Sequence, residues 1–197
     1  MRKFVLIPDS FKGTMSSAQI CRTVGEEIRA VYPDAVVQEI PVADGGEGTV
    51  DAFLTAVGGQ KVMVKCKGPY LEEMTGFYGL LPDGTAVVEM AAAAGLPLVG
   101  ENRHADKTTT YGVGELIAHA VTHGAKRVVL GLGGSATNDG GCGCAAALGV
   151  KFFNAKGEAF VPVGGTLNEV VSISAAELLP VLTTIPVTAM CDIDNPL

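Results

Sequence analysis

The sequence predicts an α/β protein built on a parallel sheet. In the first 60 residues, short β-branched apolar runs alternate with stretches that carry apolar residues at helical spacing. Glycine-rich polar loops follow several of the predicted strands. Hydrophobic residues make up 48 % of the 197 residues, which is enough for a sizeable core. Strands that alternate with helices form parallel sheets, and ligands collect at the carboxyl ends of such strands.

Composition narrows the class of ligand. Lys and Arg total 14 against 21 Asp and Glu, so the net charge is −7, which argues against a nucleic-acid surface. Charges interrupt every apolar stretch before the roughly 20 residues that a membrane span requires, and the apolar start is too short for a signal peptide. The five scattered cysteines favour reduced thiols. We therefore expect a cytoplasmic protein with a small-molecule ligand, no nucleic acid and no membrane.

The first four elements follow the β-α-β-α order. Residues 2–7 predict a strand. Ser16 and Gln19 form a capping-box pattern, so a helix should begin at about Ser17 and end near residues 32–34. Residues 35–42 predict a second strand, and residues 49–57 predict a helix that ends at two glycines. This order predicts that the two strands are parallel.

The middle of the chain changes character. Residues 61–66, 76–81 and 86–90 predict strands, and the turn at 82–85 favours an antiparallel hairpin between the last two. We place a domain transition near residue 66, which divides the chain into residues 1–66 and 67–197. Further on, the sequence predicts helices at 112–123, 142–148 and 174–182, and strands at 126–130, 150–153 and 185–190.

The loop at residues 131–141 lies between a predicted strand and a small-residue helix. It is not a Walker A loop, because no G-K-[ST] follows. Gly131, Gly133 and Ala136 match the dinucleotide pattern G-x-G-x-x-A, but the acidic residue expected about 20 positions later is missing. A turn that needs glycine only for its backbone is a third interpretation. The polarity of the turn favours a cradle for a small anion or phosphate, formed by Gly133, Gly134, Ser135, Thr137, Asn138 and Asp139.

Two other loops carry candidate residues. The 8–14 loop offers Ser10 and Lys12, and a lysine there could contact a transferring phosphoryl group, although a solvated surface lysine is the simpler interpretation. The 43–48 loop offers Asp44 and Glu47, which could hold Mg²⁺ or substrate hydroxyls. The alternative for this pair is an acidic first turn that complements a helix dipole.

Asp192 and Asp194 follow the last predicted strand. A carboxylate there could orient or deprotonate a hydroxyl that attacks a phosphoryl group. The alternative is a turn closed by residues 195–196.

Four blocks of the sequence together resemble the bacterial type-1 glycerate kinase family. They are residues 8–13 (PDSFKG), 43–49 (ADGGEGT), 133–141 (GGSATNDGG) and 191–197 (CDIDNPL), in the order that the family has. The resemblance implies ATP-dependent phosphorylation of D-glycerate, with 2-phosphoglycerate favoured, and a requirement for Mg²⁺. It also implies a Rossmann-like parallel-sheet domain with a second α/β domain inserted into it and a cleft between the two.

The resemblance assigns chemistry to the candidate residues. We expect Lys12, Asp192 and Asp44 to be catalytic, and Ser10 and the polar 133–139 turn to bind substrate or phosphate. Glu47 and Asp194 are the metal candidates. Family members continue well past the last block, so we expect an N-terminal portion with a truncated fold that needs a missing C-terminal segment. The alternatives are a dinucleotide-dependent oxidoreductase and a catalytically inactive fragment of the kinase.

Overall fold

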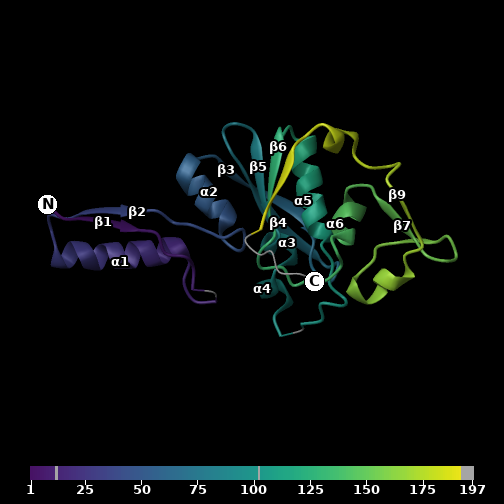
Figure 1. The fold of residues 1–197 in the computed structure, drawn as a ribbon, viewed down its shortest axis with the longest axis horizontal. Coiled ribbons are helices and arrows are strands. Elements are labelled where there is room, and N and C mark those ends of the chain that lie inside the picture. The colour runs from purple at the N-terminus through teal and green to yellow at the C-terminus, as the bar shows by residue number, and fades with distance from the viewer. Residues whose placement is uncertain (12, 102, 192–197) are drawn as a thin grey trace.

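The computed structural model describes residues 1–11, 13–101 and 103–191 (Figure 1). Their strands form three sheets of two, five and three strands. Figure 1 shows the two-stranded sheet and its helix as an arm at the N-terminal end, beside a larger body built on the five-stranded sheet.

The arm consists of β1 (Lys3–Leu6), α1 (Ser17–Val31) and β2 (Val36–Glu39). β1 and β2 pair in parallel, as the sequence predicts. The predicted capping box also forms, because the Gln19 backbone N–H donates to Ser16 Oγ at 3.2 Å and the Ser16 N–H donates to Gln19 Oε1 at 2.8 Å. These bonds satisfy N–H groups that the first helical turn leaves without partners.

The five-stranded sheet has the order β10-β6-β5-β4-β3. Its strands are β3 (Gln60–Lys67), β4 (Glu73–Leu80), β5 (Thr85–Glu89), β6 (Arg127–Gly131) and β10 (Val187–Met190). β5, β6 and β10 are parallel, whereas β3, β4 and β5 are joined as antiparallel neighbours. The predicted hairpin at residues 82–85 and the α/β class with parallel strands are therefore both confirmed.

Helices cover both faces of this sheet. Ala86 and Val88 of β5 pack in the main core with Val113 and Leu116 of α5 (Tyr111–Thr122). Val87 points the opposite way, because successive strand residues alternate between faces, and it packs with Val50 of α2 (Thr49–Val57). All five residues of β5 are buried, which makes it the centre of the body.

Short elements complete the body. The helices α3 (Ala91–Ala94) and α4 (Leu96–Val99) follow β5, and α6 (Cys142–Ala147) follows β6. β7 (Lys151–Phe153) pairs with both β8 (Ala159–Phe160) and β9 (Ser172–Ser174). 3₁₀ turns cover Gly164–Glu169 and Pro180–Thr183.

The helix predicted at residues 174–182 is wrong. Pairing with β7 holds the start of that segment in β9. Pro180 then opens a single 3₁₀ turn, because proline disfavours helical backbone at the residue before it.

The predicted transition near residue 66 falls at the end of β3. β3 already belongs to the five-stranded sheet, so the change from the arm's sheet to the body's sheet lies between β2 and β3, with α2 in between. The division into domains at residue 66, one inserted into the other, stays a prediction. Among the described residues, no helix is long and apolar enough to cross a membrane.

Candidate functional site

The loops that follow parallel strands meet at the carboxyl ends of β6 and β10. The Gly133 N–H donates to the Gly45 carbonyl at 3.0 Å, which joins the 131–141 loop to the 43–48 loop. The Leu132 N–H donates to the carbonyl of Met190, the last residue of β10, at 3.1 Å. The parallel-sheet argument predicted this convergence, although the 43–48 loop follows a strand of the other sheet.

Glycine is required where these loops touch. A Cβ on Gly131 would lie 2.3 Å from the Gly45 carbonyl oxygen, and one on Gly133 would lie 2.8 Å from Gly46 Cα. Both distances are shorter than any side chain tolerates, so the two backbones approach as closely as glycine alone permits.

The 131–141 loop does not form a dinucleotide turn. Gly131 ends β6, and α6 begins only at Cys142, whereas the dinucleotide pattern opens a helix directly after its strand. The loop instead runs beside residues 94–96, where Ala136 N–H donates to the Ala94 carbonyl at 2.8 Å and Leu96 N–H donates to the Gly134 carbonyl at 3.0 Å. The match at Gly131, Gly133 and Ala136 therefore lacks its structural context.

Asp139 is buried and surrounded by donors. Its carboxylate accepts from the backbone N–H groups of Thr110 at 2.8 Å, Gly141 at 3.0 Å and Gly143 at 3.1 Å. The hydroxyls of Thr110 and Thr109 donate to it at 2.9 and 3.4 Å. The carboxylate thus ties the first turns of α5 and α6 to the loop, and these contacts account for its burial without a ligand.

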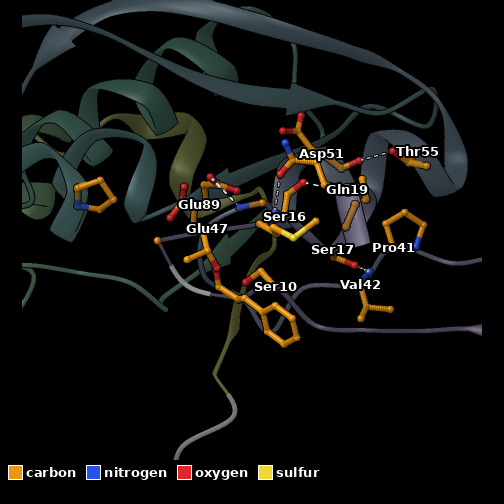
Figure 2. Close-up of a pocket in the computed structure, with 18 of the residues that line it drawn as sticks. Ser10, Ser16, Ser17, Gln19, Pro41, Val42, Glu47, Asp51, Thr55 and Glu89 are labelled. Carbon is orange, nitrogen blue, oxygen red and sulfur yellow. Dashed lines mark hydrogen bonds between the residues drawn. The ribbon is translucent and has the colours of Figure 1, made fainter. Parts of the chain in front are cut away.

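A cavity lies where the arm meets the body (Figure 2). It has a volume of about 690 Å³. Ser10 and Glu47 line it, whereas none of the described residues 133–139 does. The start of α1, residues 41–42 and α2 add to its walls, and the body contributes Lys61, Phe77, Glu89 and Pro97.

Ser17 holds two of the walls together. Its hydroxyl donates to the Pro8 carbonyl at 2.6 Å and accepts from the Val42 N–H at 2.9 Å, and Figure 2 shows the second of these bonds. The loops that follow β1 and β2 are therefore fixed to the first turn of α1. Loops joined in this way can present their side chains to one ligand.

Comparison with known proteins identifies the family. A sequence model of the glycerate kinase family matches residues 4–197. The chain belongs to the glycerate kinase family. It is 46 % identical to a glycerate kinase of Bacillus cereus and 42 % identical to glycerate 2-kinase of Escherichia coli, over 99 % of this chain and 52 % of each relative.

A solved structure agrees with the family assignment. A crystal structure described as that of a glycerate kinase 2 from Salmonella typhimurium LT2 matches with a TM-score of 0.83 and 40 % identity. The match covers 100 % of this chain and 53 % of that one. The chain thus spans about half the length of the glycerate kinases that it matches.

The predicted site residues fall into four groups within this member of the family. Ser10 and Glu47 line the cavity, and Glu47 is exposed. Asp44 belongs to the same 43–48 loop as Glu47 but does not line the cavity, and its carboxylate accepts from the Gly46 N–H at 3.0 Å. The 133–139 turn contacts the 43–48 loop from outside the cavity, with Ser135 Oγ 2.7 Å from Thr137 Oγ1 and with Gly134 and Asn138 exposed. Lys12, Asp192 and Asp194 lie outside the described residues.

Sequence reasoning missed Glu89. It is the last residue of β5, and its side chain reaches the cavity wall although the residue is only 2 % exposed. Its Oε2 accepts from the Val50 N–H at 2.9 Å and its Oε1 from the Gly48 N–H at 3.4 Å. Burial raises the pKa of this carboxyl group, while the two N–H groups act in the opposite direction. The available signal was one acidic residue at the end of an otherwise apolar strand.

Lys61 is a second residue that the sequence did not single out. Its ammonium lies 2.5 Å from Asp51 Oδ1 and 4.4 Å from the centre of the Phe77 ring, and all three residues line the cavity. It therefore brings positive charge to a wall that also carries Glu47 and Glu89. No group of three or more His, Cys, Asp or Glu among the described residues is arranged to hold a metal.

Proposed function

We propose that the protein phosphorylates D-glycerate with ATP and that 2-phosphoglycerate is the product. The observation that carries this proposal is the cavity of about 690 Å³ that two polar loops of a glycerate kinase family chain line together, with Ser10 from one and Glu47 from the other. A cavity of this size suits small-molecule substrates. The dinucleotide-dependent oxidoreductase is set aside, because the relatives are kinases and its loop geometry is not met.

In this proposal the cavity holds reacting groups by position and charge, which are the main requirements of phosphoryl transfer. Ser10 donates a hydrogen bond to the substrate, and Lys12 neutralises charge that develops on the transferring phosphoryl group. Asp192 orients the attacking hydroxyl, with Asp44 as the alternative for this role. Lys61 is the cation among the described residues of the cavity wall, but Asp51 pairs with it, so the positive charge that an anionic substrate needs comes mainly from Lys12 and Mg²⁺ in this proposal.

The 133–139 turn is proposed as the second binding element, for ATP phosphates or for the glycerate carboxylate. Its exposed Gly134 and Asn138 and the hydroxyls of Ser135 and Thr137 offer donors to an anion. Asp139 takes a different role here, because its carboxylate already accepts from buried donors and would repel an anion. Competition between ATP and glycerate analogues in variants of the turn would separate the two ligands.

Mg²⁺ fits the donors that the 43–48 loop provides. Mg²⁺ in kinases is held by one or two carboxylates together with substrate phosphates, and Glu47 presents an exposed carboxylate to the cavity. We propose Glu47 as its main ligand in this chain, with Asp194 as the second. The ion, when bound, neutralises phosphate charge. The same proposal includes a cytoplasmic location. It also includes that activity depends on a C-terminal segment equivalent to the part of the relatives that this chain does not cover.

A coupled ADP-release assay tests the function. The protein is expressed from its natural gene, so that any sequence beyond residue 197 is included, and it is assayed with ATP, Mg²⁺ and D-glycerate. We expect glycerate-dependent ADP production, and its absence would overturn the proposal. Lys12→Ala should lower kcat at least tenfold, whereas Lys156→Ala, in the exposed turn after β7, should leave it unchanged. Assay of residues 1–197 alone tests the inactive-fragment alternative.

A further inference from the structure

We infer that Glu89 is a positioning residue that holds the 43–48 loop in place for the reaction, by binding the first turn of α2. The inference rests on the proposed function, because the reaction is the one proposed for the cavity. Glu89 ends β5 in the body of the molecule, whereas the 43–48 loop on which it acts follows β2 of the arm.

The first turn of α2 needs an acceptor from outside the helix. The residue before it, Gly48, has φ of 90° and makes no side-chain cap. The N–H groups of a first helical turn have no partner within the helix. Glu89 supplies both missing acceptors, to Gly48 and Val50, across 41 and 39 residues of sequence.

The same turn is locked to the loop. Thr49, which is buried, donates from its hydroxyl to the Gly46 carbonyl at 2.7 Å and from its N–H to the same oxygen at 3.2 Å. A displacement of the turn therefore moves Gly46, which lies between Asp44 and Glu47. Gly46 also abuts Gly133 of the neighbouring loop. The two carboxylates proposed to act on substrate and metal are thus carried by a segment that Glu89 holds.

Only an ionised carboxylate serves both N–H donors well, because a protonated one gives up an acceptor position to its own proton. The charged groups that face Glu89 are Asp51 of α2, Lys61 of β3 and Glu47 of the loop, which line the same cavity. Burial favours the neutral form of Glu89, so the pKa of this carboxyl lies above its ordinary value. The hold on the loop should therefore weaken as the pH falls.

Glu89→Gln tests this inference, with Glu115→Gln as the matched control. The glutamine keeps the volume but turns an amide N–H₂ toward one of the two donors. Glu115 makes the same kind of bond at a distance from the cavity, since its carboxylate accepts from the Lys67 backbone N–H. Steady-state kinetics and hydrogen exchange of the Gly48 and Val50 amides are measured for the wild type and both variants.

We expect Glu89→Gln to speed exchange at Gly48 and Val50 at least tenfold and to lower kcat at least tenfold, with a smaller change in KM. The acidic limb of the pH–rate profile should also lose the contribution of this group. Glu115→Gln should stay within twofold of the wild type in kcat. Unchanged exchange or unchanged kcat in Glu89→Gln would overturn the inference and leave the proposed function standing. A wild type without glycerate-dependent turnover would overturn the proposed function, and this inference with it.

Discussion

Replacing Asp139 should lower the stability of the fold far more than it changes substrate binding. Three backbone N–H groups and two threonine hydroxyls donate to this buried carboxylate. Asp139→Ala removes the acceptor of these donors at a buried position, where water does not take its place. A buried donor that loses its partner costs about 1–3 kcal/mol, and losing one side of a buried charged network costs about 3–5 kcal/mol in total.

We therefore expect Asp139→Ala to lower the free energy of unfolding by about 4 kcal/mol. With an m-value of about 2 kcal/mol/M, this lowers the urea midpoint by about 2 M. Asp139→Asn should cost less, about 1–3 kcal/mol, because its amide oxygen still accepts from some of the donors. Urea unfolding followed by circular dichroism and by fluorescence measures both, and equal m-values would show that the two variants unfold as the wild type does.

Asn138→Ala is the control, since it changes the exposed neighbour in the same loop. The free energy of unfolding obtained from its urea midpoint should stay within about 0.5 kcal/mol of the wild-type value. If Asp139→Ala unfolds no earlier than this control, the carboxylate does not hold α5 and α6. If Asp139→Asn keeps its stability but raises KM tenfold, Asp139 binds substrate, as the sequence alone predicted.

Three further predictions concern other parts of the fold. Gly131→Ala forces its Cβ against the Gly45 carbonyl, so it should lower the free energy of unfolding by about 1–3 kcal/mol and also lower kcat/KM. An unchanged urea midpoint and unchanged kinetics would contradict the loop contact. Burial, and secondarily the charge of Asp139, raises the pKa of the Cys144 thiol to about 12, so about one thiol in 10⁴ is ionised at pH 8. Ellman's reagent should therefore label Cys144 far more slowly in the folded protein than in urea, and equal rates would refute this. Burial, and secondarily the charge of His123, lowers the pKa of His119 below 6.5. The stability that the neutral imidazole contributes is therefore present above pH 6.5 and is lost as the pH falls through the folded-state pKa. A titration midpoint of His119 above 6.5, measured by NMR, would contradict this.

Much of the fold could be predicted because it depends on neighbours in sequence. The capping box at Ser16 and Gln19 and the hairpin turn at residues 82–85 are completed within a few residues, so their patterns suffice. The helix expected at 174–182 failed because pairing with β7, more than 20 residues away, decides the start of that segment. A local pattern cannot weigh a distant partner.

The candidate site divides in the same way. The sequence by itself determined that polar loops follow the parallel strands, and the sheet's geometry then requires the loop after β6 to lie beside the end of the neighbouring strand β10. Only the tertiary structure decided that Gly131 and Gly133 serve the contact with the 43–48 loop, that Asp139 is buried against α5 and α6, and that Glu89 reaches the first turn of α2. The contacts of Gly131 with Gly45, of Asp139 with Thr110 of α5's start and of Glu89 with Val50 join residues about 30 to 90 positions apart, and only the packing of the core sets such distances.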